Sequence, residues 1–112
     1  MAMARGRQRA KEPPYAAAKP TVDELLVFGA RLNRTSVDFL MIEAQTALTF
    51  SGIALGAHDE VKKSRNCRFA RQAYDTVLRL SDKVTFTDRD KRILSRDLRR
   101  LKGALRSLGE VV

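Results

Sequence analysis

The chain of 112 residues has little of what catalytic and metal sites are commonly built from. It contains one cysteine, one histidine, no tryptophan and only 6% aromatic residues. One cysteine cannot form an internal disulfide, and one cysteine with one histidine cannot build a Cys/His metal cluster within a chain. These shortages exclude a disulfide framework and a zinc finger, and they require a core of aliphatic side chains.

Catalytic constellations are missing as well. His58 and Cys67 are nine positions apart, so one helix would place them on opposite sides, which does not suit a nucleophile and its base. The segment GIALGAHDE lacks the GK[ST] ending of a phosphate-binding loop. Cys67 has basic neighbours that would lower its pKa, although a small filler at the core edge is the simpler interpretation. We predict a protein that is not an enzyme and that has no cofactor and no metal.

Long apolar runs are scarce at the start of the chain, so no secretory signal is visible. Residues 1–20 contain Pro13, Pro14 and Pro20 and almost no large apolar side chains, which predicts a disordered basic tail. The stretch 37–57 has the length to span a membrane, but the carboxylate of Glu43 would be costly there. We expect a cytoplasmic protein for which a membrane is not a partner.

What the sequence does contain is helical periodicity, without a convincing period-two alternation. We predict an all-α fold: a small antiparallel three-helix bundle over 37–57, 59–84 and 88–108, with a short preceding helix over 22–32. Thr21 and Glu24 have capping-box spacing, and Thr35 and Asp38 repeat it after Asn33, which suits a helix C-cap. This predicts a break at 33–36, with a single bent helix as the alternative. Short connections favour antiparallel neighbours within one domain over 21–112.

Each predicted helix has its own apolar pattern. The helix over 37–57 is apolar nearly all round, which is typical of a central, buried helix, and its Gly52-x-x-x-Gly56 would let a neighbouring helix approach closely. The last helix ends at Gly109 and has leucines at 4-3-4-3 spacing, namely Leu94, Leu98, Leu101, Leu105 and Leu108.

Positive charge is the strongest compositional signal. Lys and Arg number 22 against 13 acidic residues, which gives a net charge of +9 and favours encounters with polyanions. Asp88, Asp90 and Asp97 partly neutralise the basic side of the last helix. Because no reading helix or interleaved aromatic residues accompany the cations, binding to DNA or RNA would be nonspecific. The candidate polyanion-binding residues are Lys62, Lys63, Arg65, Arg68, Arg71, Arg92, Arg96, Arg99 and Arg106.

Residues 67–84, CRFARQAYDTVLRLSDKV, resemble the second helix of a tetratricopeptide-type hairpin and are similar to the middle helix of the MIT (microtubule-interacting and trafficking) domain. The resemblance covers residues 44–84, and its matching residues form the inward face expected of this helix: Ala70, Ala73, Tyr74, Val77 and Leu80. No second copy follows at the repeat period, and Asp82 stands where a terminal proline is usual. Both families bind peptide segments in helical grooves, so the resemblance implies another protein or helical segment as the partner.

The sequence therefore leads to two hypotheses of function. The first is a small non-catalytic helical interaction module, with a partner groove between helices bordered by Phe69, Tyr74 and Leu78. The alternative is a nonspecific nucleic-acid-binding protein that uses the arginine-rich helix surfaces and the basic tail. The identity of the partner and the formation of homo-oligomers stay open.

Overall fold

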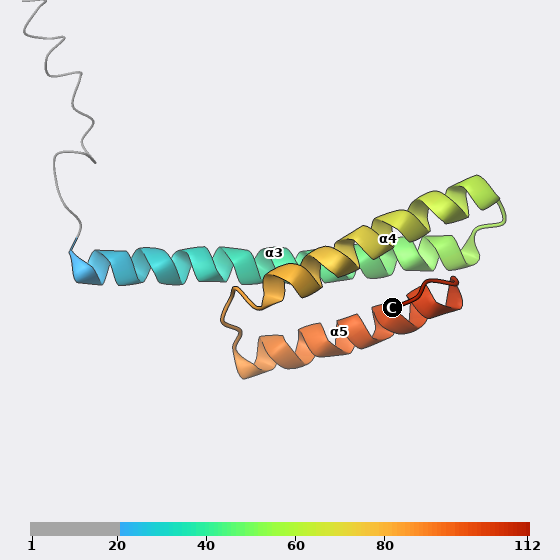
Figure 1. Ribbon diagram of the computed structural model, residues 1–112. Helices are drawn as coiled ribbons and strands as arrows, with labels where there is room; N and C mark the ends of the chain where they lie inside the picture. The colour runs from blue at the N-terminus through green and yellow to red at the C-terminus, as the bar shows by residue number, and fades with distance from the viewer. Residues whose placement is uncertain (1–20) are drawn as a thin grey trace, which may run out of the picture. The chain divides into compact units, whose positions relative to one another are not determined.

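The computed structural model describes residues 21–112, which form three α-helices and no strand. Helix α3 spans Val22–Gly56, α4 spans Glu60–Ser81 and α5 spans Asp88–Ser107 (Figure 1). The predicted tail at 1–20 lies outside the described residues. The all-helical fold is confirmed for the described part, and α4 and α5 have nearly the predicted bounds.

The chain divides into two units after Arg31, and the second unit is Leu32–Val112. In the first unit, the side chain of Thr21 accepts a hydrogen bond from the amide of Glu24 at 3.1 Å, so the predicted cap begins α3. The core, the other two helices and all candidate surfaces belong to the second unit.

The predicted break at 33–36 is wrong, because α3 continues through it. The side chain of Asn33 donates to the main-chain oxygen of Thr85 at 2.8 Å and accepts from the Thr85 amide at 2.8 Å. Arg34 pairs with Asp38 at 2.7 Å and with Asp90 of α5 at 3.0 Å, so Asp38 is used inside the helix. A helix cap at this place would contribute about 0.5–2 kcal/mol of stability. The contacts of Asn33 and Arg34 outweigh that contribution, so the helix continues.

The ends of the two shorter helices follow local signals in the sequence. Asp59 accepts a hydrogen bond from the amide of Val61 at the start of α4, and Thr87 accepts one from the amide of Asp90 at the start of α5. After α5, Gly109 has a φ of 91°, which costs other residues about 1–2 kcal/mol. The predicted cap at Gly109 is therefore confirmed.

The core is formed by small and aliphatic side chains from all three helices. One cluster of buried residues contains Ala47, Ala70, Ala73, Tyr74, Leu101 and Leu105. A second contains Leu40, Ala44, Val77 and Leu94. Five of the twelve buried apolar residues are alanine, so small side chains make up a large part of this core. The predicted inward faces of α4 and α5 are confirmed at these positions.

Helix α3 differs from the central, buried helix that its composition predicts. One side is buried, but Leu32, Phe39 and Ile42 are exposed by 54%, 47% and 60%. No atom lies within 4 Å of where a Cβ at Gly52 or Gly56 would stand, so no helix packs closely on the predicted G-x-x-x-G. By length and composition, α3 alone among the described helices is able to cross a membrane, a criterion that core helices of soluble proteins also meet.

Three buried polar residues lie within the second unit. Ser51 donates to the main-chain oxygen of Leu48 at 2.8 Å, and Asn66 donates to that of Lys62 at 2.8 Å. Asp97, only 3% exposed, accepts two hydrogen bonds of 3.2 Å from the guanidinium of Arg96. The sequence-based placement of Asp97 on the basic outer side of α5 is therefore wrong.

Candidate binding surfaces

The candidate arginines of α5 are exposed and lie away from its buried leucines: Arg92, Arg96, Arg99 and Arg106. Arg106 donates two hydrogen bonds to the main-chain oxygen of Val112, and Arg96 pairs with Asp97. Arg92 and Arg99 form no ion pair among the described residues, and they border an open hollow of about 380 Å³. The outer side of α5 is thus a cationic surface with at least two unpaired guanidinium groups.

The candidate cations of α4 do not form one patch. At 100° per residue, Lys62 and Arg65 lie on the same side of the helix as Phe69. Lys63, Arg68 and Arg71 instead line a cavity of about 460 Å³ that also includes Glu60, Cys67 and Glu110. The cations of α4 therefore point to two different surfaces, and the cavity carries mixed charge.

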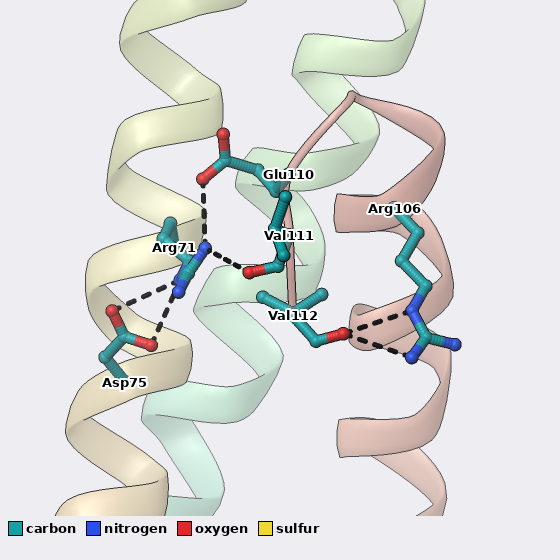
Figure 2. Close-up of polar contacts among 6 residues, drawn as sticks. All are labelled: Arg71, Asp75, Arg106, Glu110, Val111 and Val112. Carbon is teal, nitrogen blue, oxygen red and sulfur yellow. Dashed lines mark hydrogen bonds and ion pairs between the residues drawn. The ribbon is translucent and has the colours of Figure 1, made fainter.

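Arg71 holds the C-terminal segment against α4 (Figure 2). Its guanidinium donates to both carboxylate oxygens of Asp75 at 3.1 and 3.2 Å, to Glu110 at 3.3 Å and to the main-chain oxygen of Val111 at 3.1 Å. The pKa of Arg71 is raised above its ordinary value, mainly by the hydrogen bonds to Asp75. Desolvation has a smaller effect in the opposite direction. Because its Nε and Nη1 groups are already engaged, Arg71 is less available to an external anion than Arg92 or Arg99.

The thiol of Cys67 is not activated by its basic neighbours. Burial raises its pKa, and the carboxylate of Glu110 raises it further, whereas Lys63 and Arg71 act in the opposite direction with smaller effects. The suggested lowering of this pKa is therefore wrong. Cys67 is half-buried and has the character of a filler at the core edge.

The three predicted groove residues do not lie together. Tyr74 is 7% exposed and belongs to the core. Phe69 is 41% exposed and packs on Phe50 of α3, with ring centroids 5.3 Å apart. Leu78 is 45% exposed, but nine positions from Phe69 amount to a half turn, so it lies on the opposite margin of α4. Of the three, only Phe69 borders an exposed apolar surface shared with α3.

That surface is a regular row on α3, here called the α3 seam. Its members follow 3-4 spacing: Leu32, Thr35, Phe39, Ile42, Thr46, Thr49, Ile53 and Gly56. None is charged, and all but the half-buried Thr46 are exposed, with Ile53 at 38%. Such spacing is that of the a and d positions of a coiled coil, which normally face another helix. The apolar pattern of residues 37–57 predicts a helix that is buried on all sides, so it does not distinguish Phe39, Ile42 and Ile53 from the core-facing residues.

A hollow lies between the α3 seam and the end of α4. It has a volume of about 440 Å³ and is lined by Thr35, Ser36, Phe39, Leu40, Leu80, Lys83 and Val84. Its apolar walls and single lysine suit one large apolar side chain with an acidic neighbour. It is the place on the seam where a partner side chain has depth to enter.

Within residues 21–112, no group of three or more His, Cys, Asp or Glu side chains is arranged to hold a metal ion. In comparisons with known proteins, the chain matches no protein-family model, no curated protein and no solved structure. The assignment of a function therefore depends on the surfaces described above.

Proposed function

We propose that the protein is a non-catalytic, cytoplasmic interaction module that binds a helical segment of another protein along the α3 seam. In this proposal the three helices form an antiparallel bundle, which the connections of three and six residues, 57–59 and 82–87, favour. The bundle covers one side of α3 and leaves the seam open to a partner.

The observation that carries the proposal is the exposure of an uncharged heptad row on a helix whose other side is fully packed. Val37, Leu40 and Ala44 are at most 2% exposed, whereas Phe39 and Ile42, on the same turns, are exposed by 47% and 60%. Large contiguous apolar patches on soluble domains commonly mark interaction sites. A helix that presents side chains at i, i+3, i+4 and i+7 would interdigitate with the seam.

A library of displayed helical peptides, selected on the folded protein, tests this function. Ile42→Asp should weaken each selected peptide at least about tenfold, because it places a charge in the centre of an apolar contact. Val61→Asp is the matched control, since Val61 is 71% exposed and lies outside the seam. Circular dichroism checks that both variants keep their helicity. Selected peptides that bind both variants equally, or a selection that yields no helical ligand, would contradict the proposal.

The outer side of α5 supports a second candidate function, nonspecific binding of nucleic acid. The specific observation is the pair Arg92 and Arg99, which are exposed, one heptad apart and without an ion pair among the described residues. If both contact phosphates of duplex DNA, replacing them by Gln should make the slope of log affinity against log salt shallower by about 2.

A charge-matched control separates a local site on α5 from the effect of net charge. The double variant Arg79→Gln/Lys83→Gln removes two charges at the end of α4, at exposed positions outside the candidate polyanion-binding residues. Labelled DNA and RNA are titrated at rising salt against both double variants. Equal losses in both would assign the binding to overall charge, and no binding at low salt would exclude this function.

A further inference from the structure

We infer that the partner helix of the α3 seam is acidic and amphipathic, with carboxylates near its two ends and an uncharged middle. This inference rests on the proposed function and adds the chemistry of the partner. It follows from the charges that border the seam on one side.

The border is a second row with 3-4 spacing, here called the α4 row, which continues just past the end of α4. Its members are Lys62, Arg65, Phe69, Gln72, Thr76, Arg79 and Lys83. Two contacts place it beside the α3 seam. Phe69 packs on Phe50 of α3, and Lys83 lines the same hollow as Phe39. A helix bound along the α3 seam would therefore have one of its flanks next to the α4 row.

The cations of the α4 row are at its two ends. Lys62 and Arg65 lie at one end and Arg79 and Lys83 at the other; all four are exposed and form no ion pair among the described residues. Arg65 and Arg79 are 14 positions apart, which corresponds to about 21 Å along a helix. Between them the row is uncharged. Carboxylates over the two ends would be attracted, whereas one over the middle would have no cation of the α4 row beside it.

A second copy of the chain does not supply such a helix. Helix α4 has six basic and two acidic residues, and α5 has eight basic and three acidic residues. Helix α3 has four acidic and two basic residues, but it carries no acidic residue after Glu43, so it lacks carboxylates near both of its ends. Self-association would also bring together two chains that each carry a net charge of +9. The flanks of paired helices select partners by opposite charge, so the α4 row selects an acidic helix from another protein.

Three synthetic peptides test the inference, all with leucines at heptad a and d positions and equal length. The first has Glu near both ends of one flank, the second has the same Glu residues moved to the middle, and the third has Lys in place of Glu. At low salt, fluorescence anisotropy should show the first binding about tenfold tighter than the third and measurably tighter than the second. The advantage should shrink as salt rises.

Variants of the protein assign the effect to the α4 row. Arg65→Glu/Lys83→Glu should reverse the preference between the first and third peptides. Arg92→Glu/Arg99→Glu changes the charge equally on α5 and should leave the order of affinities unchanged. If this control variant reverses the order as well, net charge explains the selection and the inference is wrong.

The outcomes separate this inference from the proposed function. If all three peptides bind equally and Ile42→Asp abolishes binding, the seam binds helices but does not select acidic ones. If no peptide binds, both ideas fail. If light scattering shows a dimer that Ile42→Asp converts to a monomer, a second copy occupies the seam and the inference is overturned.

Discussion

The change Leu101→Ala tests the core on which every surface described above depends. Leu101 is fully buried in the cluster with Ala47, Ala70 and Leu105. Truncating a buried leucine typically costs 2–5 kcal/mol, and the cost is high where neighbours cannot relax into the space. Alanine neighbours have no side chain long enough to fill the cavity. We therefore expect a loss of about 3–4 kcal/mol in the free energy of unfolding.

The matched control is Leu78→Ala, which changes the same side chain at a position in α4 that is 45% exposed. Because both positions lie inside helices, the difference in helix propensity cancels, and we expect this variant to lose less than about 1 kcal/mol. Urea denaturation followed by far-UV circular dichroism measures both, with equal m-values as the check on two-state behaviour. In a domain of this size the melting temperature of Leu101→Ala should fall by more than about 12 °C. Equal costs in the two variants would refute the assignment of Leu101 to the core and Leu78 to the surface.

Three further changes test individual contacts. Asn33→Ala should cost about 1–2 kcal/mol of stability, because two hydrogen bonds to Thr85 are lost while helix propensity improves; a gain in stability would contradict the pairing. Gly109→Ala should cost about 1 kcal/mol by calorimetry because of the positive φ, and an unchanged melting temperature would contradict that conformation. Cys67 should react with iodoacetamide more slowly in the native chain than in urea at mildly alkaline pH, since burial raises its pKa. The free energy of unfolding should therefore fall as pH rises through the range in which thiols titrate, because the unfolded chain binds fewer protons there. Equal alkylation rates in the native and the unfolded chain would refute the raised pKa of Cys67.

The features that the sequence predicted correctly are those encoded within a few neighbouring residues. The cap at Thr21 and the helix end at Gly109 both involve residues that are close along the chain. The leucine spacing of α5 likewise identifies its inner side, because one face of that helix is polar and the other is not. These signals were sufficient for the helices and for much of their buried faces.

The features that the sequence did not predict depend on contacts between distant positions. Asn33 has the residue type of a helix cap, and only its pairing with Thr85, 52 positions away, shows why α3 continues. Asp97 looks like part of a solvated basic face, yet it is buried beside Arg96. The exposure of Phe39 and Ile42 was not predicted either, because composition shows that residues 37–57 are apolar nearly all round but not which side of the helix its neighbours cover.

The alanine-rich contact between the helices restricts how this sequence is able to diverge. At Ala44, Ala47 and Ala70, which are all completely buried, any larger side chain would overpack the core and displace its neighbours. The surrounding leucine sites tolerate exchange with other aliphatic residues of similar volume. A distant homologue would therefore be identified more readily by the spacing of its small residues than by the identity of its large ones.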